Sequence, residues 1–294
     1  MRASFEYLRP SSPIEAANMK AEHGDRACFW AGGTDLVLLW QRSQIDLDYC
    51  IDLTRLTELD DITCDDDSIR IGAMTSLATL ERAAARHHLL TMLSDVTKLM
   101  CTPQSRTIAT VGGNLCNASP AADLSPAFVA VNAEARIVGA AGERGILLED
   151  FFEGVNATAL DEGELLQEIV IPLPHGRIDA TYRRIDRTVV DIALVNAAAS
   201  VTVDAVNKVT QTRIALGAVA PVILRSPEAE AMLDGVDITQ VDGALLDKMG
   251  ARAAEDAKPI SDVRASAAYR TQMVRVMTRR ALEDSIRKLG GAVS

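Results

Sequence analysis

The chain has 294 residues, of which 48% are hydrophobic and 24% charged, a composition typical of an ordered globular protein long enough for two domains. A net charge of −11 and only 4% aromatic residues argue against nucleic acid as a partner, because phosphates are repelled and few side chains can stack on bases. The five cysteines are scattered and form no CxxC pair, which argues against a disulfide framework and a metal cluster. No apolar run approaches about 18 residues, which argues against a membrane span. Together these features favour a cytoplasmic protein.

Near the N-terminus the pattern predicts a strand, a helix and a second strand. Residues 5–8 form the first strand. Residues 12–15, SPIE, are a capping box with proline at the first helical position, so a helix should run to about His23. Residues 27–30 read as a buried strand. The sequence AGGTDL, residues 31–36, then precedes an apolar stretch that predicts a helix. The first glycine pair therefore lies between a strand and a helix.

Two more strands and two helices are predicted before residue 101. Residues 49–53 and 69–73 are strand-like, and the acidic stretch between them reads as a solvated turn. Thr-Ser at residues 75–76 caps a helix that should end at His87 and His88, where imidazole favours the helix C-terminus. We assign this pair no metal, because no carboxylate or cysteine follows it at ligand spacing.

The segment TVGGNLCNASPAAD, residues 110–123, is the centre of the predicted site. Adjacent glycines allow positive φ and a close approach to a ligand, so several main-chain N–H groups can point into one concavity. Such groups hold a diphosphate without Lys or Arg, since each hydrogen bond to a charged acceptor contributes roughly 1.5–3 kcal/mol. Asn114, Asn117 and Ser119 add neutral polar groups, and Asp123 can accept from a ribose or ribityl hydroxyl. The alternative is a glycine-rich turn between strands.

The two glycine pairs, at residues 32–33 and 112–113, can close on one diphosphate from two sides. A tight turn explains either pair alone. It does not explain why small hydroxyl or amide residues flank both pairs. We therefore expect the two pairs to lie together in the fold.

The sequence predicts a hairpin over 136–148 and a strand over 164–172. The Pro-Leu-Pro segment that follows, residues 172–174, is the predicted domain boundary. We expect a first domain over 1–175, in two parts of about 1–55 and 56–175, and a second domain over 176–294. In the second domain the pattern predicts an antiparallel sheet followed by three helices. Its strands are residues 180–185, 191–203 and 209–219.

Arg183 and Arg184 are adjacent on the first strand of this second domain. Neighbouring residues of a strand face opposite sides of the sheet, so at most one of the two can reach back to a ligand of the first domain.

With these motifs in place, the sequence resembles the flavoprotein (medium) subunit of molybdenum-containing hydroxylases, the family of carbon monoxide dehydrogenase and xanthine dehydrogenase. The resemblance covers nearly the whole chain. It is carried by AGGTDL at 31–36, TVGGN at 110–114, NASPAADL at 117–124 and LLQEIVIP at 165–172. It implies an α+β fold, in which a two-part FAD-binding domain of the vanillyl-alcohol oxidase and MurB type precedes a smaller domain of antiparallel sheet plus helices.

The resemblance also implies one FAD on this chain and no catalytic residue of its own. Asp123 would accept from the ribityl or ribose hydroxyls, and Leu165 would pack on the adenine or isoalloxazine side. Arg183 stands where relatives often have Lys, and would keep a positive charge near the flavin. The residues implied to hold the diphosphate are Ala31, Gly32, Gly33, Thr34, Asp35, Leu36, Thr110, Val111, Gly112, Gly113 and Asn114.

As partners the resemblance implies a small subunit with [2Fe-2S] clusters and a large subunit with molybdopterin, in a dimer of heterotrimers. The large subunit would hydroxylate a heteroaromatic or related substrate. Electrons would then pass through the clusters to the FAD and on to NAD, a quinone, a cytochrome or dioxygen. Neither the substrate nor the final acceptor follows from this sequence.

Two other functions compete with this one. A self-contained flavin oxidase or reductase would need an acid or base near the flavin, for which Tyr182, Asp186 and Asp191 are the candidates. A nucleotide-binding protein without redox chemistry could use the same glycine loops for another phosphate ligand.

Overall fold

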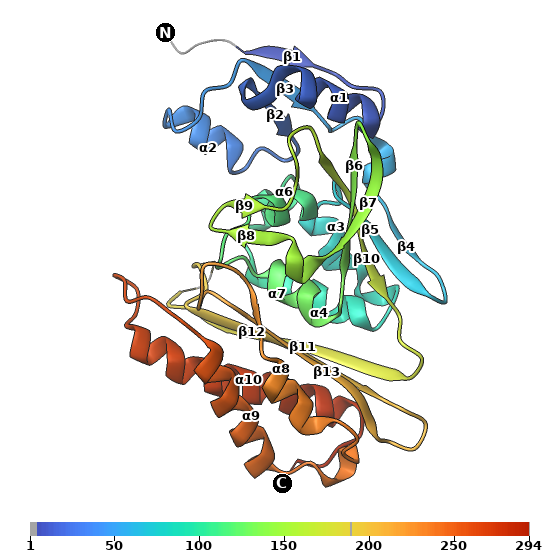
Figure 1. Cartoon of the computed structure of the whole chain (residues 1–294), viewed down its shortest axis with the longest axis vertical. Coiled ribbons are helices and arrows are strands. Elements are labelled where there is room, and N and C mark those ends of the chain that lie inside the picture. The colour runs from blue at the N-terminus through green and yellow to red at the C-terminus, as the bar shows by residue number, and fades with distance from the viewer. Residues whose placement is uncertain (1–4, 189, 294) are drawn as a thin grey trace.

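Three main sheets lie one below another along the long axis of the molecule, each with its own helices (Figure 1). The computed structural model describes residues 5–188 and 190–293. The chain runs once from the N-terminal tier, residues 6–52, through the middle tier, residues 62–172, to the C-terminal tier, residues 177–288. The fold is α+β, as predicted.

The N-terminal tier is a small parallel sheet with a helix packed on it. In sheet order the strands are β1 (Glu6–Leu8), β3 (Tyr49–Asp52) and β2 (Ala27–Trp30), and the helices are α1 (Pro13–His23) and α2 (Leu36–Gln41). Helix α1 begins where predicted, because Ser12 Oγ accepts a hydrogen bond from the Glu15 N–H at 3.2 Å, and it ends at Gly24 with φ +57°. The loop between β2 and α2 carries the first glycine pair.

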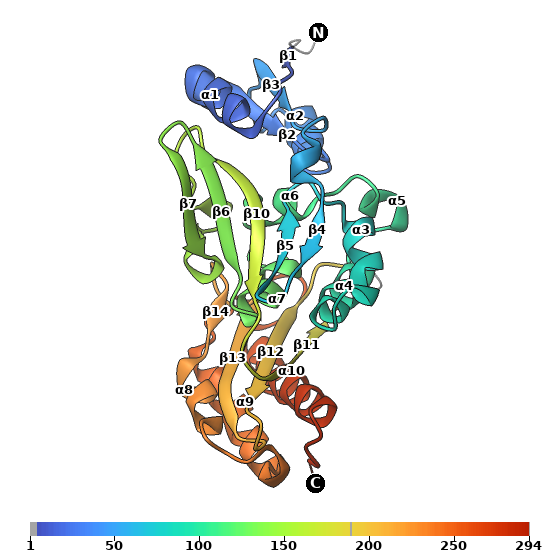
Figure 2. The same cartoon turned by 90° about the vertical axis from the view of Figure 1, so that its right-hand side faces the viewer.

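The middle tier is a five-stranded antiparallel sheet with helices between it and the C-terminal tier (Figure 2). Its strands, in sheet order, are β4 (Ile62–Cys64), β5 (Ser68–Gly72), β10 (Leu165–Pro172), β6 (Glu134–Gly139) and β7 (Gly142–Leu147). Its helices are α3 (Leu77–Arg82), α4 (Leu89–Leu99), α5 (Pro103–Arg106), α6 (Val111–Cys116) and α7 (Leu124–Ala130), and a small pair of strands, β8 (Phe152–Gly154) and β9 (Ala157–Thr158), lies beside them.

Two predictions for this tier are wrong. Strand β4 occupies part of the acidic stretch expected to be a turn, because it pairs with β5 across residues 62–71. His87 and His88 do not end a helix: His88 is the residue before the first turn of α4, and its Nε2 lies 2.9 Å from the carbonyl oxygen of Ile178. The two imidazoles pack against each other with ring centroids 4.3 Å apart.

The C-terminal tier is an antiparallel sheet with three helices on the face away from the middle tier (Figure 1). Its strands are β11 (Arg177–Ile185), β12 (Val195–Val203), β13 (Val209–Gly217) and β14 (Leu224–Arg225), and its helices are α8 (Pro227–Glu230), α9 (Gly243–Asp256) and α10 (Ala267–Lys288). All nine residues of β12 are buried, because α10 covers one face and α7 the other. No described helix, α10 included, is both long and apolar enough to cross a membrane.

Candidate functional site

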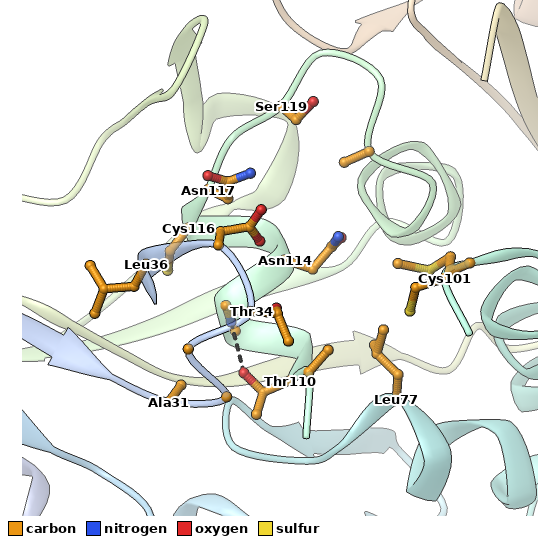
Figure 3. Close-up of a pocket in the computed structure, with 18 of the residues that line it drawn as sticks. Ala31, Thr34, Leu36, Leu77, Cys101, Thr110, Asn114, Cys116, Asn117 and Ser119 are labelled. Carbon is orange, nitrogen blue, oxygen red and sulfur yellow. Dashed lines mark hydrogen bonds between the residues drawn. The ribbon is translucent and has the colours of Figure 1, made fainter. Parts of the chain in front are cut away.

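A cavity of about 610 Å³ lies between the tiers, within the usual size range of about 300–1,000 Å³ for ligand pockets. Residues 32–33 and 112–113 both line it, so the structure brings the two glycine pairs together as predicted (Figure 3). The C-terminal tier contributes Arg184 and residues 190–192. The predicted site residues that line the cavity are Ala31, Gly32, Gly33, Thr34, Asp35, Leu36, Thr110, Gly112, Gly113, Asn114, Asp123 and Leu165.

The loop over residues 31–36 packs closely on its neighbours and leaves main-chain N–H groups unbonded. Gly33 has φ +67°, a conformation that glycine adopts without strain. Gly32 lies so close to the backbone of Ile108 that an added Cβ would stand 1.9 Å from its carbonyl oxygen. Among the described residues, no acceptor within the protein bonds the N–H groups of residues 32–35. These consecutive amides are therefore available to a bound anion.

The second glycine pair behaves differently, because it forms the first turn of α6. Thr110 is the N-cap, and its Oγ1 accepts the Gly113 N–H at 3.0 Å (Figure 3). The other N–H groups of this turn are also bonded inside the protein. The Val111 N–H donates to Thr75 O at 2.9 Å, the Gly112 N–H to Ala73 O at 2.7 Å and the Asn114 N–H to Thr110 O at 3.1 Å. The amides of residues 111–114 are thus already used.

The predicted positive φ at Gly112 and Gly113 is therefore wrong, since both are helical. What requires glycine at position 112 is close packing: a Cβ there would lie 2.7 Å from the Ala73 Cβ and 2.8 Å from its carbonyl oxygen. The pair lets α6 approach the end of β5, and this approach shapes the floor of the cavity. Among the described residues of the two glycine loops, the unbonded main-chain N–H groups lie in the loop over 31–36 instead.

Two further predictions for this segment have different outcomes. Val111 is fully buried in the hydrophobic core and does not line the cavity, because the first turn of α6 points its side chain inward. Asn114 lines the cavity, and its buried Oδ1 has no hydrogen-bond partner in the described structure. A buried amide oxygen without a partner costs free energy, so a ligand donor at this position would relieve that cost.

Asp123 lies at the wall that the middle and C-terminal tiers share. The Tyr182 hydroxyl donates to its Oδ1, and Arg184 Nη1 donates to its Oδ2 at 3.0 Å. Arg184 also bonds Asp186, with Nε 2.8 Å from Oδ2, and only 3% of its side chain is exposed. Burial raises the pKa of Asp123 and raises that of Tyr182 well above its usual value. Both carboxylate oxygens of Asp123 are therefore already bonded within the protein.

The structure corrects the expectation for Arg183. Its guanidinium forms an ion pair with Asp284 of α10 and lines a separate groove, because alternate residues of β11 face opposite sides of the sheet. Arg184, which shares a face with Tyr182, points to the cavity instead.

Apolar residues of two different hydrophobic clusters line the cavity. Phe29, Leu53 and Leu165 belong to one cluster, whereas Met100 and Cys101 belong to or pack against the other. Burial raises the pKa of the Cys101 thiol. Arg106 holds residues 100–101 in place, because its Nη1 donates to the carbonyl oxygens of Met100 at 2.8 Å and Cys101 at 3.0 Å.

Several lining residues carry no signal in the sequence. The side chains of Leu77, Met100 and Cys101 look like ordinary core residues, and only the tertiary structure turns them toward the cavity. Arg184 is one of the two arginines that the sequence leaves open, and it shares a strand face with Ala180 and Tyr182. Asn117 and Ser119 line the cavity as neutral polar groups, as expected.

The cavity fits a flavin dinucleotide in three respects. The amides of residues 32–35 are unbonded and could donate to a diphosphate, Asn114 Oδ1 is a buried acceptor without a partner, and apolar side chains line much of the wall. An alanine at position 32 would place its Cβ against the backbone of Ile108, so the loop can approach residue 108 only with glycine there. The residues present are therefore compatible with FAD.

Glu164, which lines the cavity at the start of β10, should contribute to stability in a pH-dependent way. Its bonds to Arg144, at 2.6–2.7 Å, lower its pKa below the ordinary 4.5. A lowered carboxyl pKa stabilises the fold above the unfolded-state value, and this contribution disappears as the pH falls through the folded-state value. We expect Glu164→Gln to be less stable than wild type at pH 7, with the difference shrinking below about pH 4.5 in urea unfolding. Arg144→Met should give the same convergence, and a constant difference down to pH 3 would contradict this assignment.

Known proteins share both parts of this chain. Residues 3–174 match the FAD binding domain in molybdopterin dehydrogenase, and residues 180–285 match the CO dehydrogenase flavoprotein C-terminal domain. The chain is 32% identical over 280 residues to the carbon monoxide dehydrogenase medium chain of Afipia carboxidovorans. The aligned region covers 95% of this chain and 96% of that one.

Solved structures agree with this match. A chain of carbon monoxide dehydrogenase from Hydrogenophaga pseudoflava superposes with a TM-score of 0.90 at 30% identity, over 98% of this chain and 99% of that one. A chain of quinoline 2-oxidoreductase from Pseudomonas putida 86 gives a TM-score of 0.88 at 25% identity, with the same coverage. The protein therefore belongs to the family of FAD-binding medium subunits of molybdenum hydroxylases, an oxidoreductase family that includes the flavoproteins of carbon monoxide dehydrogenase and xanthine dehydrogenase.

Proposed function

We propose that this chain is the electron-transfer subunit of a cytoplasmic molybdenum hydroxylase complex, built as a dimer of heterotrimers. In this proposal a small partner with [2Fe-2S] clusters delivers electrons to this chain, which passes them to an external acceptor. A large partner with molybdopterin hydroxylates a heteroaromatic or related substrate. The names of relatives support this, since the first of them is a carbon monoxide dehydrogenase subunit and another belongs to an enzyme that acts on quinoline.

The observation that carries the proposal is the loop over residues 31–36 facing α6 across the cavity. The N–H groups of residues 32–35 bind the diphosphate, and Gly33 holds them in position with its positive φ. Asn114 Oδ1 would accept from the cofactor, and Leu165 would pack against its adenine or its isoalloxazine side. Bound FAD supplies the electron-transfer chemistry, while the protein binds and orients it.

The structure gives little support to a self-contained flavin oxidase. Its three candidate acid–base groups are committed to other partners: Tyr182 donates to Asp123, Asp186 binds Arg184, and Asp191 pairs with Arg187 at 2.9 Å. The hydrogen bond from Arg187 lowers the pKa of Asp191, so Asp191 is a weaker base. Burial raises the pKa of Tyr182 well above its usual value. Substrate chemistry is therefore assigned to a partner subunit.

This function is tested by purifying the complex through an affinity tag on this chain. We expect a flavin spectrum, together with iron and molybdenum by elemental analysis, and flavin reduction when a substrate of the complex is added. The separated full-length chain should keep its flavin spectrum and show no reduction with the same substrate. Substrate-dependent reduction by the chain alone would favour the self-contained oxidase, and a chain that ignores added FAD would overturn both functions.

A further inference from the structure

One short segment, residues 100–110, lines the cavity and also supports the loop over residues 31–36. Its lining residues, of which Figure 3 labels the second and the last, are Met100, Cys101, Ser105, Ala109 and Thr110. Near its end, the Ile108 carbonyl oxygen packs so closely on Gly32 that an added Cβ would lie 1.9 Å from it. The placement of this segment therefore affects both a wall of the cavity and the loop with the unbonded amides.

The segment begins with a strained turn. Cys101 has φ +33°, in the left-handed region that residues other than glycine rarely adopt. Such a conformation persists only where the surrounding structure holds it. The turn joins the end of α4 to the start of α5, so a relaxed backbone at Cys101 would displace the residues that follow.

Arg106 is the side chain that holds this turn. Its Nη1 donates to the carbonyl oxygens of Met100 at 2.8 Å and Cys101 at 3.0 Å, which flank the Cys101 Cα. Among the described residues, no main-chain N–H bonds either oxygen. The Arg106 Nε donates to Glu81 Oε2 at 2.8 Å and so ties the turn to α3. One guanidinium makes all three bonds because its N–H groups form a rigid planar fork.

Stability alone does not explain a buried arginine here. Only 8% of Arg106 is exposed, and replacing a buried ion pair by well-packed apolar side chains is often neutral or stabilising. An apolar side chain cannot, however, bond the two carbonyl groups of the turn. The segment is tied to α3 a second time, because the Leu77 N–H donates to the Ala109 carbonyl oxygen at 2.8 Å. Both ends of the cavity-lining segment are thus fixed to the same helix.

We infer that Arg106 is a positioning residue for FAD: it clamps the strained turn at Cys101 to α3 and thereby places the segment that lines the cavity and supports Gly32. This inference rests on the proposed function, since it assumes that FAD occupies the cavity. Arg106 is not itself one of the lining residues. It therefore acts through the main chain of residues 100–109 and makes no contact with the cofactor.

The test is the FAD dissociation constant of the full-length chain, measured by titration under conditions in which urea unfolding shows each variant to be fully folded. Arg106→Met should raise the constant about tenfold, equivalent to about 1.4 kcal/mol of binding free energy, because the turn relaxes and the wall moves. Arg106→Lys should lie between wild type and Arg106→Met, since an ammonium group cannot reproduce the planar fork.

Arg86→Met is the matched control. The Arg86 Nη1 also donates to a carbonyl oxygen of the middle tier, that of Ile62 at 2.6 Å, but neither of these residues lines the cavity. Its FAD dissociation constant should equal that of wild type.

A second change, Cys101→Gly, separates positioning from a general loss of structure. Glycine adopts a positive φ without strain, so the turn should keep its conformation without the clamp. We expect Arg106→Met/Cys101→Gly to bind FAD more tightly than Arg106→Met, whereas a purely structural role predicts that the two changes weaken the chain additively. If Arg106→Met does not fold, the same comparison is made in the Arg106→Lys background.

Two results would overturn the inference: wild-type FAD affinity in Arg106→Met, or no recovery of affinity when Cys101→Gly is added. A wild-type chain that does not bind FAD would instead overturn the proposed function.

Discussion

Gly32→Ala is expected to abolish tight FAD binding and to destabilise the chain. The added Cβ would lie 1.9 Å from the Ile108 carbonyl oxygen, 2.7 Å from the carbonyl carbon and 3.0 Å from the Ala109 Cα. All three are backbone atoms, so no side-chain rotation relieves the clash, and the loop over 31–36 must move away from residues 108–109. Overpacking of this kind costs typically about 1–3 kcal/mol, and here it also displaces the amides of residues 32–35. Titration with FAD and urea unfolding measure the two effects.

Two other glycines provide the comparison. Gly154→Ala should leave FAD binding and stability nearly unchanged, because the nearest atom to its Cβ would be the Ala157 Cβ at 3.7 Å. Gly113→Ala should have a smaller effect than Gly32→Ala, since its Cβ would meet only Thr110 Oγ1, at 3.0 Å, and its backbone is helical. FAD binding by Gly32→Ala with wild-type affinity would show that the loop does not hold the diphosphate.

The glycine pairs illustrate how far the sequence predicts the site. Their composition and spacing correctly predict that both pairs line one cavity. Their conformations do not follow, because glycine serves equally well for positive φ and for close packing of a helix. The choice depends on neighbours that are distant in sequence: Ile108 lies against Gly32, and Ala73 lies against Gly112. Only the folded structure shows that the main-chain N–H groups at the first pair are unbonded, whereas those at the second pair are bonded within the protein.

The arginine pair shows the same limit in a strand. Period-two alternation correctly predicts that only one of Arg183 and Arg184 can face the cavity. Which one does so depends on how β11 packs against α7 and α10. Resemblance to a family favours Arg183, whereas the buried Tyr182 places Arg184 on the face toward Asp123. The ends of helices and strands are predicted well where a capping residue marks them, as Ser12 marks the start of α1.

Glu149→Gln is expected to lower the free energy of unfolding by about 3 kcal/mol, because breaking a buried ion pair typically costs 3–5 kcal/mol and Glu149 is partly exposed. Glu149 joins the middle tier to the C-terminal tier: its Oε2 lies 3.1 Å from Arg213 Nη2 and 2.9 Å from Arg225 Nη1. Arg213 is only 7% exposed, and burial, followed by the nearby charge of Arg225, lowers its pKa. Without Glu149, Arg225 keeps its ion pair with Glu230, whereas Arg213 keeps only its hydrogen bond to the Val129 carbonyl oxygen among the described contacts.

A double-mutant cycle distinguishes an uncompensated charge from lost packing. If the cost of Glu149→Gln comes from leaving the buried charge of Arg213 without a partner, then Arg213→Met should remove part of that cost when the two changes are combined. Urea unfolding should therefore give Glu149→Gln/Arg213→Met a smaller loss than the sum of the single variants. Asp95→Asn removes half of an exposed ion pair with Lys98 and should change stability by less than about 0.5 kcal/mol. Strict additivity at Glu149 and Arg213 would mean that the two tiers are held together by packing, with the buried charges contributing independently.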